Sequence, residues 1–237
     1  MHRGYSNKRL IKRHTVTTRL AHWGWAISLL FLLGSGLQIF NAHPVLYIGD
    51  QSGFGFDNAV LTIGTEGRAF PAWATIPSGM DLATGRIVHF FFAWVLVSAL
   101  FLWLLGALVS GHLWRNLRPT ARDLRSLGTD IRTHARFQFP HRRTYGPLQK
   151  LSYGALLFAL FPLIVATGLA MSPGMNAAAP WLPELLGGRQ TTRTLHFCAA
   201  AALLGFFVLH IVMVVLAGPL NELRAMVTGW YRIDEGE

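Results

Sequence analysis

The sequence predicts an all-α integral membrane protein, a four-helix bundle formed by a single domain over residues 1–237. Composition is the first observation behind this prediction. Hydrophobic residues make up 52% of the chain and charged residues only 14%, which is typical of membrane proteins rather than soluble ones. The second observation is that four apolar runs are long enough to cross a hydrocarbon layer of roughly 30 Å as helices. These runs cover approximately residues 20–40, 87–110, 151–171 and 195–216.

The first run follows a basic N-terminal tail. It has the length of a full span and lacks a small-residue cleavage site, so we expect a retained helix rather than a signal peptide. The segment that follows is rich in glycine, proline and aromatic residues. Because loops of about 45 residues are uncommon unless they are functional, we expect this long periplasmic loop to cover a site or to dock a partner.

The second run leads into a basic connector, in which Leu124, Leu127 and Ile131 recur at helical spacing between arginines. This pattern predicts an amphipathic helix on the cytoplasmic membrane surface, with a solvated loop as the alternative. In the third run, Pro162 is expected to kink the helix, and the Thr-Gly pair at 167–168 is expected to allow close packing.

Charge is distributed unevenly around the four runs. With four spans, 17 of the 21 Lys and Arg residues lie on one side and 4 on the other. This bias predicts that both termini are cytoplasmic, in a multi-pass protein of the bacterial inner membrane. The net charge of +10 is then explained by topology and by attraction to membrane lipid, and nucleic acid is not expected as a partner.

Histidines at membrane depth are the candidate functional residues. Ionisable residues within a membrane are costly and usually functional. In three places an arginine precedes a histidine by three residues at the mouth of an apolar run, and a fourth histidine lies inside the last run. The residues are Arg19 and His22, Arg86 and His89, Arg193 and His196, and the fourth histidine His210. Four imidazoles on three helices form two pairs, and a pair of imidazoles can fill both axial positions of a haem iron that passes electrons.

Helical geometry indicates how the histidines pair. Fourteen residues rise about 21 Å along a helix and end about 40° short of four full turns, so His196 and His210 share a face at opposite depths. His22 and His210 lie toward the cytoplasm, whereas His89 and His196 lie toward the periplasm. We therefore expect His89 and His196 to bind an outer haem, and His22 and His210 an inner one. Cys198 is the only cysteine, and no Cys-x-x-Cys-His motif is present, so both haems are expected to be non-covalent haem b.

The three arginines are expected to bind the haems as well. Each shares a helix face with its histidine and lies toward the water, where haem propionates would be placed. A guanidinium group matches a carboxylate bidentately, so Arg19, Arg86 and Arg193 are candidate propionate ligands. The alternative is that they only anchor the helix ends at the membrane surface.

Several motifs in the chain resemble those of one family. They are Arg19-Leu-Ala-His22-Trp23, Gly85-Arg86-Ile-Val-His89-Phe90, Arg193-Thr-Leu-His196 with His210, Tyr145-Gly-Pro-Leu-Gln149-Lys150, Pro162 and Thr167-Gly168-Leu169. Over most of its length the chain is similar to the bacterial cytochrome b561 and nickel-dependent hydrogenase b-type cytochrome family. This family includes the membrane subunits of formate dehydrogenases and thiosulfate reductases.

The resemblance implies a function and a second site. Family members carry electrons between the membrane quinone pool and a partner, often a periplasmic molybdenum or nickel enzyme. Tyr145, Gln149 and Lys150 would lie near the inner haem and are candidate quinone contacts. They could equally be interface residues at the start of the third helix.

Three functions remain open from the sequence. The leading one is a di-haem subunit of an oxidoreductase complex that moves electrons between quinone or quinol and a periplasmic redox enzyme. The second is a self-contained enzyme that oxidises superoxide and reduces quinone, with a basic funnel at the outer haem. The third is a transporter whose histidines relay protons or bind a metal, although about 21 Å between His196 and His210 is too far for one metal site. The colour of the purified protein separates the third from the first two.

Overall fold

The computed structural model describes residues 8–53, 57–65, 69–136 and 144–234. Within them, four helical segments are long and apolar enough to cross a membrane, which confirms the predicted fold class. They are α1 (Val16–Asn41), α2 (Leu82–Val109), the segment Pro147–Met171, and α8 (Arg189–Ala217). Each begins a few residues before the predicted run, because helical backbone continues into the polar turns at the membrane surface and hydropathy marks only the apolar part.

The described chain falls into two compact units, which we describe separately. The first consists of Met1–Trp23, Leu100–Phe158 and Gly205–Glu237, and the second of Gly24–Ala99 and Ala159–Leu204. All four spans contribute residues to both units. Each unit contains one of the two expected histidine pairs.

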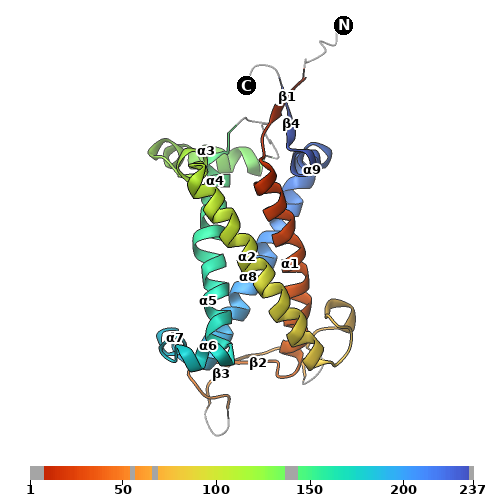
Figure 1. The fold of residues 1–237 in the computed structure, drawn as a ribbon, viewed down its shortest axis with the longest axis vertical. Coiled ribbons are helices and arrows are strands. Elements are labelled where there is room, and N and C mark those ends of the chain that lie inside the picture. Colours follow the sequence, from red (N-terminus) through yellow and green to blue (C-terminus); the bar gives the residue numbers. More distant parts are fainter. Residues whose placement is uncertain (1–7, 54–56, 66–68, 137–143, 235–237) are drawn as a thin grey trace. The chain divides into compact units, whose positions relative to one another are not determined.

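In the first unit, the two ends of the described chain pair with each other. Strand β1 (Lys8–Lys12) runs antiparallel to β4 (Trp230–Asp234), as Figure 1 shows. Helix α9 (Pro219–Thr228) follows α8 after a break at Gly218, which has a left-handed φ of 110°. Tyr231 is buried against Ala225 and Ile233. This sheet is not predicted from the sequence, because its strands have only five residues each and come from opposite ends of the described chain.

Helix α3 (Ala121–Ala135) is the predicted surface helix, and its helical structure is confirmed. It begins with a capping box in which the Thr120 side chain accepts from the Asp123 N–H and Asp123 Oδ2 accepts from the Thr120 N–H. Two of the three apolar residues that predicted it, Leu124 and Ile131, are exposed. This exposure fits a helix whose apolar side faces lipid.

The third span is not one uninterrupted α-helix. It consists of α4 (Pro147–Ala155), a π-helical turn η3 (Leu156–Leu160) and α5 (Phe161–Met171). Pro162 lies at the start of α5, directly after the π turn, where its missing N–H cannot continue the regular α-helical hydrogen bonds. The distortion predicted at Pro162 therefore takes the form of a π turn directly before it.

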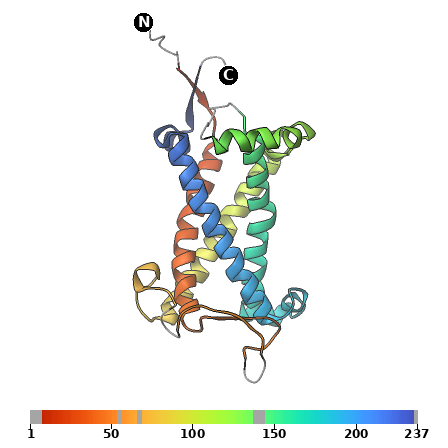
Figure 2. The ribbon, with the colours of Figure 1, turned by 180° about the vertical axis from the view of Figure 1, so that it is seen from behind.

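In the second unit, the long loop after α1 has structure of its own. It forms the antiparallel strands β2 (Val45–Tyr47) and β3 (Ala59–Thr62), followed by a short 3-10 helix η1 (Ala72–Ala74). Residues 54–56 and 66–68 of this loop lie outside the described residues. Helices α6 (Pro173–Ala178) and α7 (Trp181–Leu185) connect α5 to α8, and the same elements can be followed from behind in Figure 2.

The loop is attached to the end of α1 by backbone and side-chain contacts. The Asn41 amide bonds the backbone of Phe70 in both directions, at 3.0 and 2.8 Å. Farther along, the Ile76 N–H donates to the Gly34 carbonyl at 3.0 Å, and a Cβ at Gly34 would lie 2.7 Å from the Ile76 side chain. Gly34 is therefore explained by close packing of the loop against α1.

Candidate functional site

The four predicted histidines lie as two pairs. In the first unit, His22 of α1 faces His210 of α8, with ring centroids 6.2 Å apart and ring planes at 59°. In the second unit, His89 of α2 faces His196 of α8, with centroids 6.3 Å apart and planes at 62°. The structure brings together the same partners that helix depth predicted, and both pairs use α8.

The separation within each pair can be compared with what a shared metal ion requires. Each nitrogen of an imidazole ring with ~1.35 Å bonds lies about 1.15 Å from the centroid, and a transition metal binds it at ~2.0–2.1 Å. Two imidazoles on opposite sides of one metal therefore have centroids about 6.3–6.5 Å apart. The observed 6.2 and 6.3 Å agree with this spacing.

The number of protein donors also fits haem better than a bare metal ion. Among the described residues, no group of three or more His, Cys, Asp or Glu side chains could hold a metal. A protein-bound zinc ion needs at least three protein ligands, whereas a haem iron takes four nitrogens from its own macrocycle and needs only two axial donors. Two isolated imidazole pairs therefore fit two haem groups.

Hydroxyl groups lie beside both histidines of the outer pair. Ser35 Oγ of α1 is 3.1 Å from His89 Nδ1, and Thr167 Oγ1 of α5 is 2.9 Å from His196 Nδ1. Ser35 and Thr167 are both fully buried. The sequence predicts no role for Ser35, and for Thr167 it predicts close packing within a family-like motif, because serine and threonine are common in membrane helices.

A glycine follows each of these hydroxyl residues. A Cβ at Gly36 would lie 3.4 Å from His89 Cε1, and a Cβ at Gly168 would lie 3.3 Å from His196 Cε1. Each ring edge thus rests against helix backbone where a larger residue would push it away. The repeated hydroxyl–glycine dipeptide in apolar runs is the sequence signal that could have located these contacts.

The inner pair has different surroundings. His22 Nδ1 is buried and has no hydrogen-bond partner among the residues that the structure describes. Aromatic rings lie beside this pair: the Trp23 ring is edge-on to His22 at 5.2 Å, and the Phe206 ring is parallel to His210 at 6.2 Å. The two pairs therefore share their ring spacing but differ in polarity.

The three predicted arginines lie at the expected helix ends but contact different groups. Arg193 donates to the backbone carbonyls of Val45 and His43, which connects α8 to the long loop. Arg19 donates to the Val227 carbonyl at 3.1 Å, while its Nε is buried without a partner within the described part of the chain. The Arg86 guanidinium is exposed, 5.9 Å from the Phe90 ring. A guanidinium has five N–H donors, so these contacts leave donors for a carboxylate.

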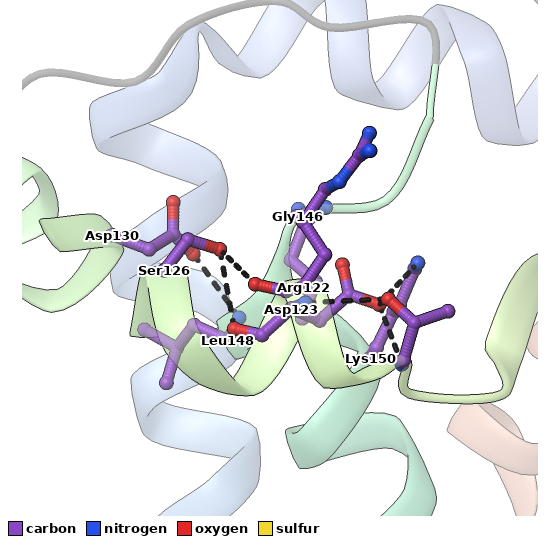
Figure 3. Close-up of polar contacts among 9 residues, drawn as sticks. Arg122, Asp123, Ser126, Asp130, Gly146, Leu148 and Lys150 are labelled. Atoms are coloured by element: carbon purple, nitrogen blue, oxygen red, sulfur yellow. Dashed lines mark hydrogen bonds and ion pairs between the residues drawn. The ribbon is translucent and has the colours of Figure 1, made fainter. Parts of the chain in front are cut away.

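The predicted quinone contacts lie around the start of α4 in the first unit. Gln149 Oε1 accepts from the Gly146 N–H and so caps the start of α4. Lys150 pairs with Asp123 at 2.9 Å, which joins α4 to α3 (Figure 3). The Tyr145 ring packs edge-on against Tyr153 at 5.6 Å and against His112 at 6.5 Å. Burial raises the pKa of Tyr145 above its ordinary value, which keeps its phenol protonated and able to donate.

Comparisons with known proteins identify a family and a relative. A family model described as prokaryotic cytochrome b561 matches residues 13–229, a range that includes the four histidines of the two pairs. The chain is also 27% identical over 225 residues to YedZ1 of Azospira oryzae, whose name describes a protein-methionine-sulfoxide reductase subunit. That alignment covers 94% of this chain and 99% of the relative.

Proposed function

The chain belongs to the prokaryotic cytochrome b561 family, and on that premise we propose that it is a di-haem subunit carrying electrons between the quinone pool and a redox enzyme. Family membership makes it a multi-pass membrane protein that binds haem b and takes part in electron transfer. The number of haems, the ligands, the quinone and the partner are the parts that we propose.

The observation that carries the proposal is the spacing of the histidine pairs, 6.2 Å in one and 6.3 Å in the other. We assign His89 and His196 as axial ligands of the outer haem, and His22 and His210 as those of the inner haem. Haem held between two imidazoles would supply a one-electron couple at an iron that does not readily bind substrate. The chain orients the imidazoles, excludes water from them and supplies Arg19, Arg86 and Arg193 for the propionates.

We place the quinone site near the inner pair, with Tyr145 as the group that touches the quinone. A half-buried, protonated phenol can donate a hydrogen bond to a quinone oxygen, and the partial burial of Tyr145 with its raised pKa supports this role. Gln149 and Lys150 hold the start of α4 and thereby position Tyr145. Their contribution to the site is then indirect.

We place the redox partner on the outer side, against the loop between α1 and α2, with both chain termini on the cytoplasmic side of the inner membrane. The relative from Azospira oryzae is named as a subunit, which supports the idea that this chain also works with a partner enzyme. The loop is a suitable surface, because Arg193, Asn41 and Ile76 connect it firmly to α8 and α1.

The test is anaerobic reduction of the purified protein by a soluble quinol, followed at the haem α-band. We expect the quinol to reduce haem, and Tyr145→Phe to slow this reduction at unchanged haem content. Matched controls are Tyr5→Phe, in the N-terminal tail, and dithionite reduction of the Tyr145→Phe variant. A haem-loaded protein that quinol does not reduce, but that superoxide reduces without any partner, would contradict the proposal in favour of a self-contained enzyme.

A further inference from the structure

We propose that Ser35 and Thr167 are positioning residues that fix the tautomer of the outer histidine pair and thereby lower the midpoint potential of the outer haem. The inference rests on the proposed function, because it takes His89 and His196 as the axial ligands. It concerns which nitrogen of each ring is available to iron and how basic that nitrogen is. Ser35 and Thr167 themselves would not touch the haem.

The hydroxyl protons of Ser35 and Thr167 are already donated to backbone carbonyls of their own helices. Ser35 Oγ donates to the Phe31 carbonyl at 2.6 Å, and Thr167 Oγ1 donates to the Leu163 carbonyl at 2.7 Å. A hydroxyl has one proton and two acceptor lone pairs. Toward the neighbouring imidazole, each of these oxygens can therefore act only as an acceptor.

The hydroxyl oxygens determine which nitrogen of each imidazole carries the proton. Nδ1 of His89 and Nδ1 of His196 must carry the proton that is donated to the hydroxyl oxygens, over 3.1 and 2.9 Å. A neutral imidazole that is protonated at Nδ1 has its lone pair at Nε2, so Nε2 is the nitrogen presented to iron in both cases.

The orientation of the His89 and His196 rings is restricted as well. Gly36 and Gly168 directly follow the two hydroxyl residues and let the Cε1 edge of each ring rest against the helix backbone. One hydrogen bond and one close contact on adjacent residues restrict how far each ring can rotate. In the inner pair, His22 Nδ1 has no such acceptor among the described residues, so this device belongs to the outer pair.

We therefore expect the two haems to differ in midpoint potential. A hydrogen bond accepted from Nδ1–H makes Nε2 a more basic ligand, which stabilises the more positively charged ferric state. Ser35 and Thr167 therefore lower the potential of the outer haem. Within the described part of the chain, no hydrogen-bond acceptor lies beside His22 Nδ1.

The experiment compares Ser35→Ala and Thr167→Val with two matched controls. Ser28→Ala removes a hydroxyl from the same helix that is equally buried but has no hydrogen-bond partner among the described residues. Thr192→Val removes another fully buried threonine hydroxyl, one that donates to the Gly188 carbonyl four residues earlier. The full-length protein is purified with haem, and each variant is measured by potentiometric titration, by the low-spin ferric EPR signal and by haem content. The outer haem is identified by its presence in His22→Ala.

We expect Ser35→Ala and Thr167→Val to raise the midpoint of the outer haem and to change its EPR g-values, with the inner haem unchanged. Ser35→Thr and Thr167→Ser, which keep a hydroxyl, should remain close to the unmodified protein. Selective loss of the outer haem in Ser35→Ala, with both haems retained in Ser28→Ala, would support the same conclusion. Unchanged potentials and EPR signals in a haem-loaded variant, or equal changes in the controls, would overturn it. If the unmodified protein contains no haem, the proposed function fails instead.

Discussion

At the scale of single residues, the histidine pairs carry the haem assignment. Each pair lies within one compact unit, so the removal of one imidazole acts first on its own partner. The side chains around the pairs are specialised in turn. Buried hydroxyls lie within hydrogen-bond distance of His89 and His196, and aromatic rings lie beside His22 and His210. Arg193 connects the helix of the outer pair to the long loop.

We predict that His196→Ala loses only the outer haem and that His22→Ala loses only the inner haem, because a haem that loses one axial ligand is weakly held. Pyridine haemochrome quantitation should give half the haem of the unmodified protein in each variant, and the remaining haem should differ between them. His43→Ala, outside both pairs, serves as the control. Loss of the same haem from both variants would contradict the pairing.

We predict that Arg193→Gln loosens the long loop, because the guanidinium donates to the carbonyls of Val45 and His43. A hydrogen bond to a charged group contributes ~1.5–3 kcal/mol, and a loss of that size raises local opening by roughly tenfold or more. Hydrogen exchange of the Ile48 and Gly49 amides, both of which are hydrogen-bonded in the structure, measures this opening. Arg86→Gln, which removes an exposed arginine, should leave their protection unchanged.

At the scale of elements, the junction of α3 and α4 shows how a surface helix is held. Asp123 Oδ2 accepts from the Thr120 N–H, which caps α3, and from Lys150 of α4, while Asp130 accepts from the Leu148 N–H at 3.1 Å. These contacts, drawn in Figure 3, attach a polar, exposed helix to the start of the third span. The predicted alternative of a solvated loop does not hold for residues 121–135.

We predict that this junction weakens in acid. The hydrogen bond from Thr120 and then the Lys150 ammonium lower the pKa of Asp123 from 3.8 to about 2. Since the folded pKa is lower than the unfolded one, the stabilisation is fully present above pH 4 and is lost as the pH falls through about 2. Hydrogen exchange of the α3 amides between pH 5 and 2, corrected for intrinsic rates, measures this loss, and Asp123→Asn should remove the pH dependence. An unchanged profile in Asp123→Asn would assign the effect to another group.

Sequence patterns predicted some elements and not others for physical reasons. Long apolar runs and the amphipathic spacing of Leu124, Leu127 and Ile131 depend on many residues, so four spans and α3 were found. Strands β1 to β4 have only three to five residues, too few for a clear alternating pattern, and β1 pairs with β4 from the other end of the described chain, which no local pattern reveals. The histidines were found because charge-bearing groups are rare in apolar runs. Ser35 was missed because only the position of His89 gives its hydroxyl a meaning.

At the scale of the whole molecule, the chain is a membrane cytochrome whose spans and basic residues predict its orientation. With four spans, the sequence predicts 17 of the 21 Lys and Arg residues on the same side as both termini. Pairing of β1 with β4 in the first unit requires both ends of the described chain to lie on one side of the membrane, in agreement with an even number of spans. Orientation itself remains a prediction from the positive-inside bias.

We predict that green fluorescent protein fused after residue 237 is fluorescent in bacterial cells, because the C-terminus is cytoplasmic. The same reporter fused after residue 180, between the third and fourth spans, should be dark, and alkaline phosphatase should give the reverse pattern. Fluorescence from the second fusion would reverse the orientation and, with it, the assignment of inner and outer haems.

The central claim is that one chain holds two b-type haems between two histidine pairs. Its most direct test is a dithionite-reduced minus oxidised spectrum of the detergent-purified, haem-supplied protein, combined with pyridine haemochrome quantitation against protein concentration. We expect a b-type spectrum and two haems per chain, as two separate bis-histidine sites require. A folded preparation with one haem per chain, or with none, would contradict it.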